Sequence, residues 1–273
     1  MKFDVSGIRK KLLEELSTKA AFAKEREVGY KLLILRVGDN PADISYERAI
    51  IKSAENVGIP VEVSTFPELV TESEILSEVT RGNMDERFGG ILIFHPLPGH
   101  LDAEAIDAVI QPEKDIDCLS PINQWRIFKG KGTMMPATAK SAAMIAEAMG
   151  ELEGKRVLII NRSMVIGKPL AMMLLDKNAT VTIGHSRTKD IPALAREHDV
   201  VVYGTGQSRW VGADFVSEGQ WIIDCGIAFD DSGKMTGDVD FDAVVDKAQY
   251  VTSVPGGVGS LTNLLLLDNV FID

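Results

Sequence analysis

The feature that most restricts the fold of this chain is a repeated alternation of short apolar runs with longer amphipathic segments. Continuous apolar runs of this kind are typical of strands buried on both faces of a parallel sheet. The segments between them have helical periodicity, and parallel strands need such crossover connections. The sequence therefore predicts an α/β protein. The predicted strands are residues 32–37, 61–66, 91–94, 157–160, 180–183, 200–203, 221–224 and 250–252.

The predicted helices follow the same alternation and are bounded by glycine and proline. They are expected at residues 8–26, 42–57, 72–81, 103–110, 138–149 and 260–269, with others beginning near Gly167, Asp190, Ala213 and Phe241. We expect two α/β lobes with a cleft between them, one formed by residues 1–140 with 260–273 and the other by residues 141–259. The second lobe is expected to be a Rossmann-like, doubly wound parallel sheet.

A strand-turn-helix pattern at residues 156–169 is the first candidate binding site. An apolar run leads into the polar turn Asn161-Arg162-Ser163, and Gly167 opens an apolar helix. Such turns hold nucleotide phosphates because free N–H groups and the helix dipole point at the anion. The full glycine fingerprint is absent, and Asn161 stands where a glycine is usual. Asparagine tolerates a left-handed backbone, so we expect it to replace glycine in that conformation. By itself the pattern fits a nucleotide site and an ordinary βα connection equally well.

Basic and small residues follow the next strands of the second lobe. His185, Ser186 and Arg187 come directly after the strand at 180–183. An acidic residue there favours NAD and a basic one favours NADP, so this end favours a 2′-phosphate. The alternative is that Arg162 and Arg187 are ordinary exposed arginines.

Two glycine-containing turns lie further along the chain. Thr205 and Gly206 follow the strand at 200–203, where small residues let the backbone approach a flat ring; an ordinary turn is equally compatible. The loop at 255–259 contains several glycines and suits a backbone that exposes N–H groups to a ligand. A flexible surface loop remains the alternative.

The composition excludes several classes of function. The chain is 45% hydrophobic and 25% charged, and its net charge of -11 argues against nucleic acid or an anionic membrane as the main partner. The N-terminus has no signal-peptide core, and no apolar run is long enough to span a membrane. The two cysteines are far apart, and the four histidines show no metal-ligand spacing. We therefore expect a cytoplasmic protein without a metal, acting on a small molecule.

Ordered motifs over nearly the whole chain resemble the methylenetetrahydrofolate dehydrogenase/cyclohydrolase family. The resemblance implies a folate-binding lobe (1–140 and 260–273), a dinucleotide-binding lobe (141–259) and a homodimer formed through the latter. It implies oxidation of 5,10-methylenetetrahydrofolate by NADP or NAD. The matching motifs are Gly38-Asp39-Asn40-Pro41-Ala42 with Tyr46, Pro96-Leu97-Pro98, Lys114-Asp115-Ile116-Asp117, Arg162-Ser163 with Val165-Ile166-Gly167-Lys168-Pro169, and Val254-Pro255-Gly256-Gly257-Val258-Gly259.

The resemblance also implies roles for individual residues. Tyr46 and Asp117 are the implied catalytic residues: Tyr46 lines the pterin, and Asp117 accepts hydrogen bonds from the pterin's amino and ring N–H groups. The implied substrate-binding residues are Tyr46, Phe94, Pro96, Leu97, Asp117, Pro255, Gly256 and Gly257. The implied cofactor-binding residues are Asn161, Arg162, Ser163, Val165, Ile166, Gly167, His185, Ser186, Arg187, Thr205, Gly206 and Thr262.

Departures from the family pattern bear on the hydrolytic step. Ile50 stands where bifunctional members carry a catalytic lysine, and Phe94 stands where they carry a glutamine. Hydride transfer depends mainly on close alignment of the nicotinamide. Hydrolysis of the methenyl product benefits from a positioned polar group of tuned pKa. The sequence therefore predicts a dehydrogenase with weak or absent cyclohydrolase activity.

Three alternatives remain open at this stage. The enzyme is bifunctional if another residue replaces the lysine; His95, where an aliphatic residue is usual, is a poor candidate because strand alternation turns it away from Phe94. A dehydrogenase acting on another small substrate and a non-catalytic folate- or nucleotide-binding protein are the others. Retention of Asp117 and of the loop at 255–257 argues against both. For the cofactor, the basic residues favour NADP, whereas Asn161 and the missing lysine resemble NAD-using relatives.

Overall fold

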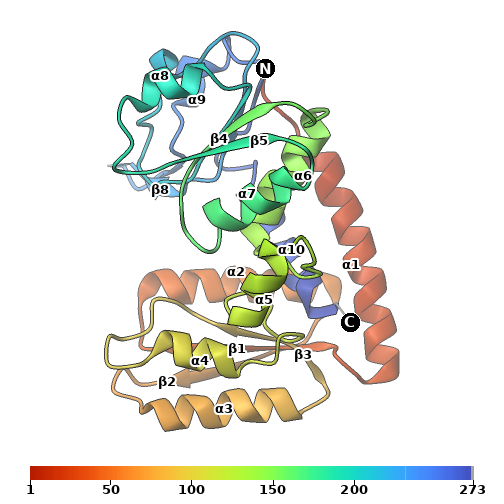
Figure 1. Cartoon of the computed structure of the whole chain (residues 1–273). Coiled ribbons are helices and arrows are strands. Elements are labelled where there is room, and N and C mark those ends of the chain that lie inside the picture. The colour runs from red at the N-terminus through yellow and green to blue at the C-terminus, as the bar shows by residue number, and fades with distance from the viewer. Residues whose placement is uncertain (231, 272–273) are drawn as a thin grey trace. The chain divides into compact units, whose positions relative to one another are not determined.

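The computed structural model describes residues 1–230 and 232–271, and its contacts divide the chain into two compact units. The first unit is Lys10–Met135 with Asn263–Asp273, and the second is Met1–Arg9 with Pro136–Thr262 (Figure 1). The sequence placed residues 1–9, 136–140 and 260–262 in the first lobe, but they group with the second. For the N-terminus the reason is direct, because the amino group of Met1 donates to the carbonyls of Val245, Ala248 and Gln249.

The first unit contains a parallel sheet with the strand order β2-β1-β3. Each strand is followed by a helix, so the βαβ alternation expected from the sequence is present. Figure 1 shows α2 on one side of this sheet and α3 on the other. The elements are α1 (Ser6–Arg26), β1 (Lys31–Val37), α2 (Pro41–Val57), β2 (Val61–Phe66), α3 (Glu72–Met84), β3 (Phe88–Ile93), α4 (Ala103–Val109) and α5 (Pro121–Phe128).

Helix α2 is defined by its end residues. The side chain of Asn40 accepts a hydrogen bond from the backbone N–H of Ala42, and Pro41 opens the first turn. Gly58 ends the helix with φ at 81°, a left-handed conformation that glycine adopts without strain. Between these ends the helix buries Ile50 and other apolar side chains against the sheet. The local signals therefore position Tyr46 and Ile50, which lie on this helix.

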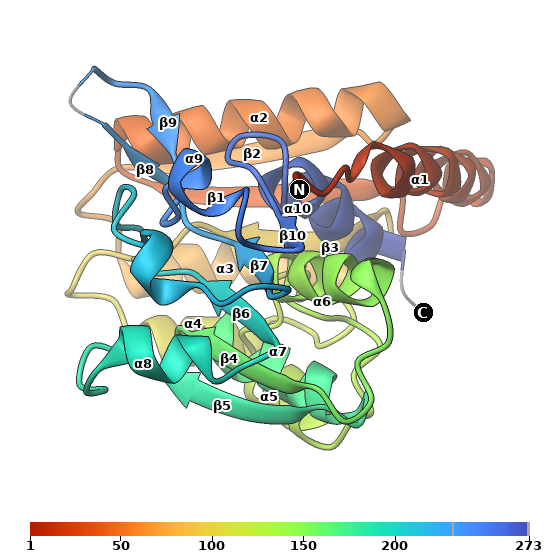
Figure 2. The same cartoon turned by 90° about the horizontal axis from the view of Figure 1, so that it is seen from above.

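The second unit contains a five-stranded parallel sheet with the order β10-β7-β6-β4-β5. Figure 2 shows these strands side by side. The chain runs outward from β4 to β5, then returns to β6 on the other side of β4, which is doubly wound topology. The elements are α6 (Ala137–Met149), β4 (Arg156–Ile160), α7 (Gly167–Leu175), β5 (Thr180–Gly184), α8 (Ile191–Arg196), β6 (Val200–Tyr203), η1 (Ala213–Phe215), β7 (Trp221–Asp224), β8 (Ala228–Phe229), β9 (Met235–Thr236), α9 (Phe241–Val244) and β10 (Tyr250–Val251). Helix α10 (Gly259–Asp268) begins in this unit and ends in the first, which also contains η2 (Asn269–Phe271).

The structure confirms the α/β class and departs from the sequence prediction in a few elements. Helix α5 was expected to be an irregular connection, because Ser-Pro is also a turn signal. Here Ser120 caps the helix by accepting from the N–H of Asn123, and Pro121 occupies its first turn. Strand β3 ends at Ile93, so Phe94 lies just beyond the strand to which it was assigned.

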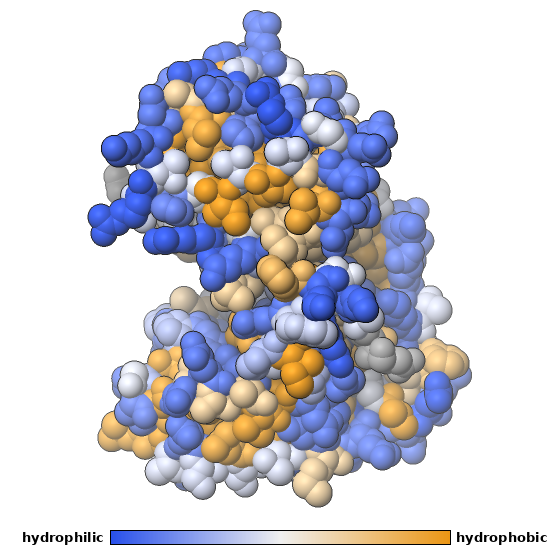
Figure 3. Space-filling view, viewed as in Figure 1, coloured by the Kyte–Doolittle hydropathy of each residue, from blue (hydrophilic) through white to orange (hydrophobic). Residues whose placement is uncertain are grey.

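The surface is largely polar on the face shown in Figure 3. Among the described residues, the structure has no helix that is both long and apolar enough to cross a membrane.

Candidate functional site

The predicted substrate residues of the first unit gather where strands β1 and β3 end. Tyr46 on α2 and Phe94 after β3 have ring centroids 5.5 Å apart with an interplanar angle of 32°. Phe94 is 7% exposed, whereas Tyr46 is 41% exposed. The two rings therefore form an aromatic wall whose outer part, Tyr46, is accessible to a ligand.

Ile50, one helical turn after Tyr46, belongs to the core and not to the accessible surface. Its side chain is 0% exposed, as is that of Ala54 one turn further on. Ile50 is thus a buried, apolar side chain without contact to solvent. Neither Ile50 nor the buried ring of Phe94 adds a polar group beside Tyr46.

The loop between α4 and α5 carries two aspartates with different environments. Asp115 is 2% exposed, and its carboxylate accepts from the N–H groups of Leu119 and Ser120 and from the amide of Asn123. No such hydrogen bond engages the half-buried carboxylate of Asp117 within the described residues. Burial, and then Asp115, raise the pKa of Asp117 to about 6. Asp115 therefore holds the loop, while Asp117 is available to a ligand.

Tyr46 and Asp117 also influence each other. Burial, and then the charge of Asp117, raise the pKa of the Tyr46 hydroxyl. A hydroxyl with a raised pKa stays protonated at neutral pH, so Tyr46 presents an uncharged ring and an O–H group. The two residues proposed as catalytic thus belong to one electrostatic cluster.

His95 was set aside by the sequence reasoning and proves to be part of this cluster. Its Nε2 lies 3.1 Å from Oδ1 of Asp107 on α4. Phe94 contacts α2 through Tyr46, so the consecutive residues Phe94 and His95 contact different helices, as alternation predicted. Pro96 is exposed, and Leu97 packs against the apolar core beneath α3 and α4.

In the second unit, Asn161 connects the turns that follow β4 and β6. Its Oδ1 accepts from the N–H groups of Ser163 and Gly167 at 2.8 and 3.0 Å. Its Nδ2 donates to the carbonyl of Gly204 at 2.6 Å. The expectation that Asn161 replaces glycine in a left-handed conformation is wrong, because its φ is not positive. The amide side chain is used instead as a hydrogen-bonding brace at the switch point of the sheet.

The turn after β4 is closely packed. A Cβ at Gly167 would lie 2.0 Å from the carbonyl oxygen of Asn161, so only glycine fits there. Ser163 accepts from the N–H of Ile166 through its hydroxyl, and Val165 and Ile166 are half-buried. Arg162 is exposed, and its guanidinium has no hydrogen-bond or ion-pair partner in the described part of the chain. The turn is therefore rigid at its base and presents a cation.

The end of β5 is basic, as the sequence indicated. The backbone N–H of His185 donates to the hydroxyl of Thr188, and the N–H of Arg187 donates to Nδ1 of His185. Ser186 and Arg187 are exposed. The nearest carboxylate along the chain, Asp190, caps α8 by accepting from Ala193. This end of the strand therefore has the residue types that suit a phosphate group.

Buried aspartates that the sequence analysis overlooked hold the turn after β6. Asp238 is 0% exposed, and its carboxylate accepts from the N–H and hydroxyl of Thr205 and from the N–H of Gln207. Asp224, at the end of β7, accepts from the N–H groups of Asp238 and Val239. Thr205 and Gly206 remain exposed above this support. Asp238 is one of three aspartates at alternate positions, with Asp240 and Asp242, so the sequence did not single it out.

The glycine loop before α10 is ordered. Gly256 has φ at 102°, and a Cβ at Gly257 would lie 2.7 Å from the carbonyl of Ser253. Pro255 and Gly256 are exposed. Thr262 on α10 donates to the carbonyl of Val258, which directly precedes the helix. These contacts disfavour a merely flexible loop.

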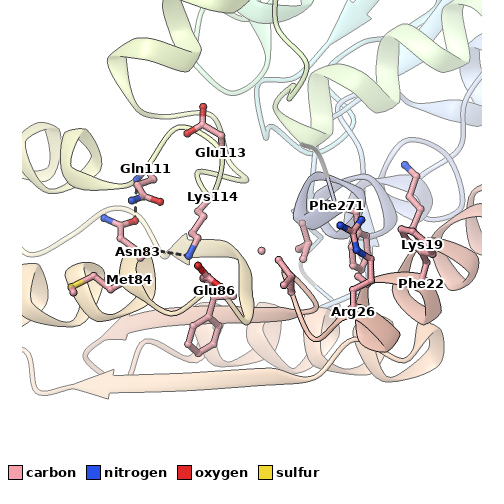
Figure 4. Close-up of a pocket in the computed structure, with 16 residues that line it drawn as sticks. Lys19, Phe22, Arg26, Asn83, Met84, Glu86, Gln111, Glu113, Lys114 and Phe271 are labelled. Atoms are coloured by element: carbon pink, nitrogen blue, oxygen red, sulfur yellow. Dashed lines mark hydrogen bonds between the residues drawn. The ribbon is translucent and has the colours of Figure 1, made fainter.

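A cavity of about 820 Å³ lies elsewhere in the first unit, and none of the predicted site residues lines it (Figure 4). It is bordered by Gly29 and Phe88, at the amino ends of β1 and β3, whereas the candidate site follows their carboxyl ends. Lys114, also in its wall, donates to the carbonyls of Gly82, Asn83 and Asp85 at the end of α3. Lys114 is therefore a structural residue of the matching motif.

Comparison with known proteins relates both units to the same enzymes. Residues 3–117 match the family model described as tetrahydrofolate dehydrogenase/cyclohydrolase, catalytic domain. Residues 136–273 match the model of the NAD(P)-binding domain of the same family. A relative from Alkaliphilus metalliredigens, named Bifunctional protein FolD, is 44% identical over 262 residues, which are 95% of this chain and 92% of the relative.

Solved structures agree with the family models. The bifunctional FolD methylenetetrahydrofolate dehydrogenase/cyclohydrolase of Campylobacter jejuni has a TM-score of 0.94 and 36% identity, covering 98% of this chain and 96% of that one. The Trypanosoma brucei enzyme, complexed with NADP cofactor and inhibitor, has a TM-score of 0.90 and 32% identity, covering 99% and 95%. By its motifs, its two units and these similarities, the chain belongs to the tetrahydrofolate dehydrogenase/cyclohydrolase family.

Proposed function

We propose that this protein oxidises 5,10-methylenetetrahydrofolate to 5,10-methenyltetrahydrofolate with NADP or NAD, and that its cyclohydrolase activity is weak or absent. The observation that carries the second part is the environment of Ile50. Its side chain is fully buried and apolar where bifunctional members have a lysine. The ring of Phe94 fills the position of their glutamine and packs against Tyr46. No proton can be moved by either residue.

The first unit supplies groups suited to binding the pterin. The carboxylate of Asp117 can accept from the paired N–H donors of the ring, and Tyr46 offers an exposed ring face. Phe94, Pro96 and Leu97 would shape the surrounding wall. In the other unit, Pro255 and Gly256 offer an exposed backbone to the folate, and Gly257 lies buried beside them. Hydride transfer then depends on alignment of the reacting groups and needs no proton acceptor on the wall.

The second unit supplies groups suited to the cofactor, which provides the hydride acceptor when bound. Asn161, Ser163 and Gly167 brace the turn, while Val165 and Ile166 fill it. Arg162 and Arg187 offer unengaged cations, and His185 and Ser186 lie beside the latter. Thr205, Gly206 and Thr262 would lie near the nicotinamide half. The absence of a carboxylate immediately after β5 supports NADP in preference to NAD.

The dehydrogenase and the hydrolytic step are separated by assaying each product. Purified protein is incubated with methylenetetrahydrofolate and either cofactor, and reduced cofactor and methenyltetrahydrofolate are measured independently. We expect both to accumulate together, and added methenyltetrahydrofolate to open no faster than in buffer alone. Hydrolysis about 10²-fold above the buffer rate would show that another residue replaces the lysine, as in the bifunctional alternative. Failure to reduce either cofactor would contradict the proposed dehydrogenase.

Arg187 is expected to determine the cofactor preference. Removing its guanidinium in Arg187→Ala should lower kcat/KM for NADP by roughly 10- to 100-fold, because a charge-assisted contact to the 2′-phosphate is lost. The value for NAD should change less than about twofold, since NAD has no such phosphate. Lys189→Ala, which removes an exposed cation from the same loop, is the matched control. Equal losses with both cofactors would contradict this assignment.

We also propose a homodimer formed through the second unit. Strand β5 is the last strand of the five-stranded sheet and has no neighbour on its outer side in the described chain. Ile183 on this strand is 38% exposed, and an exposed apolar edge is the kind of surface that a second copy would cover. The proposed metabolite substrate favours the cytoplasm as the location of the protein.

A further inference from the structure

The His95–Asp107 pair has no role in the hydride transfer proposed above. His95 follows β3 in the loop that leads to Pro96, and Asp107 projects from α4. Asp107 is 8% exposed and lies next to Ile106, which is fully buried, on the helix face that packs inward. Burying a carboxylate on such a face destabilises the fold unless a hydrogen-bonding or oppositely charged group compensates it. Nε2 of His95, 3.1 Å from Oδ1 of Asp107, is that group.

All the ionisable neighbours of His95 that the structure identifies are acids. Asp107 comes from α4, and Asp115 and Asp117 come from the following loop; on α2, Tyr46 faces Asp117. Burial opposes the charged imidazole, but the hydrogen bond to Asp107 and the surrounding carboxylates outweigh it, so the pKa of His95 is raised. His95 is thus the basic member of a cluster whose other identified ionisable groups are carboxyl groups and a phenol.

Asp117 is the member of this cluster whose ionisation is most affected by His95 in this account. Burial and Asp115 raise its pKa to about 6, and Asp107 adds to this, while His95 acts in the opposite direction. Asp115 adds a negative charge beside Asp117, and its carboxylate is held in place by three hydrogen bonds that it accepts within the loop. Without a nearby cation, Asp117 would be protonated over part of the neutral range and would lose an acceptor site.

We propose that His95, held by Asp107, is a positioning residue that keeps Asp117 ionised and thereby able to accept the N–H donors of the pterin. The inference rests on the proposed function, since it assigns the use of Asp117 to folate binding. His95 touches no reacting atom in this account. Its effect should therefore appear in the pH dependence of substrate binding and not in the rate at saturation.

The test is the pH profile of the KM for methylenetetrahydrofolate in His95→Leu. In the unchanged protein, KM should rise as pH falls through about 6, where Asp117 becomes protonated. In His95→Leu the inflection should move to about pH 7, so that KM at about pH 6.5 is roughly threefold higher. At about pH 8.5, KM should return to the unchanged value, with kcat and the KM of the cofactor unaffected. A purely structural role would raise KM equally at every pH.

Two further variants guard against misfolding and nonspecific effects. The double variant His95→Leu with Asp107→Leu replaces the charged pair by an apolar pair. Because Asp107 raises the pKa of Asp117 and His95 lowers it, the inflection of the double variant should lie between those of the unchanged protein and His95→Leu. His100→Leu removes another histidine of the first unit, whose Nε2 lies 3.0 Å from the carbonyl oxygen of Val70, and should leave the profile unchanged. An inflection in His95→Leu that coincides with the unchanged one overturns the proposal.

A measurement without substrate separates this inference from the proposed function. The carboxyl carbon of Asp117, assigned by its loss in Asp117→Asn, is titrated by NMR in ligand-free protein. We expect its pKa to be about one unit higher in His95→Leu than in the unchanged protein. If the protein fails to oxidise methylenetetrahydrofolate but this difference is present, the proposed function is wrong and the electrostatic pair stands. If oxidation is observed and the difference is absent, the positioning role is wrong.

Discussion

Replacing Asp117 by asparagine is expected to lower kcat/KM for methylenetetrahydrofolate by roughly 10²-fold. A carboxylate accepts from two donors at once, whereas an amide offers one acceptor and presents its own NH₂ group to the second pterin donor. The lost charge-assisted contact and the unpaired donor together account for this magnitude. Most of the loss should appear in KM at neutral pH, because the aspartate is proposed to bind the substrate and not to transfer a proton.

The pH dependence provides the sharper readout of Asp117→Asn. Burial and Asp115 raise the pKa of Asp117 to about 6, so the unchanged protein should bind folate well above that pH and progressively less well below it. Asparagine does not titrate, so the variant should show a flat KM profile across this range. Asp43→Asn, which makes the same change of charge on α2 within the first unit, is the matched control. A variant that keeps the inflection near pH 6 would show that another group binds the pterin.

Replacing Asp238 by alanine is expected to have the second large effect, on stability and on cofactor use together. The carboxylate is fully buried and accepts from the N–H and hydroxyl of Thr205 and from the N–H of Gln207. Alanine leaves these donors without their acceptor, which should cost about 2–4 kcal/mol in free energy of unfolding. We expect the Tm to fall by roughly 5–10 °C.

The same substitution should release the turn at Thr205 and Gly206. Since this turn is proposed to lie near the nicotinamide, kcat/KM should fall at least about tenfold with both NADP and NAD. Asp240→Ala is the control, because Asp240 lies two residues away and its side chain makes no capping bond to α9. Calorimetry and steady-state kinetics on both variants separate the two effects. Full activity in Asp238→Ala at low temperature would mean that the aspartate contributes stability alone.

Much of the local structure followed from local patterns in the sequence. The strands at β2, β6 and β7 have the bounds that their apolar runs predicted, and Asn40, Pro41 and Gly58 delimit α2 as helix signals should. These features depend on residues that are close in the chain, where propensity, capping and burial act together. Helix α5 was missed because Ser120 and Pro121 fit a turn as well as a helix N-terminus.

The sequence proposed which residues form the candidate site, but it did not indicate the contacts between them. The basic end of β5 and the separate roles of Phe94 and His95 followed from residue type and alternation. The sequence pointed to Asn161 because asparagine tolerates a left-handed backbone, but its φ is not positive. The structure shows that its side chain matters instead, since Nδ2 donates to the carbonyl of Gly204. The supports under Thr205 were overlooked, because nothing near Thr205 in the sequence points to Asp238.

The sequence by itself determined the α/β class and the family, and it placed apolar residues at positions 50 and 94, because these features depend on residue identity and short-range periodicity. Only the tertiary structure decided that His95 meets Asp107, that Asp115 is occupied while Asp117 is available, and that Asp238 supports the cofactor-side turn. The physical reason is that these contacts join residues brought together by the crossovers of parallel sheets. A hydrogen bond between such residues depends on the position of each strand end, which local patterns do not specify.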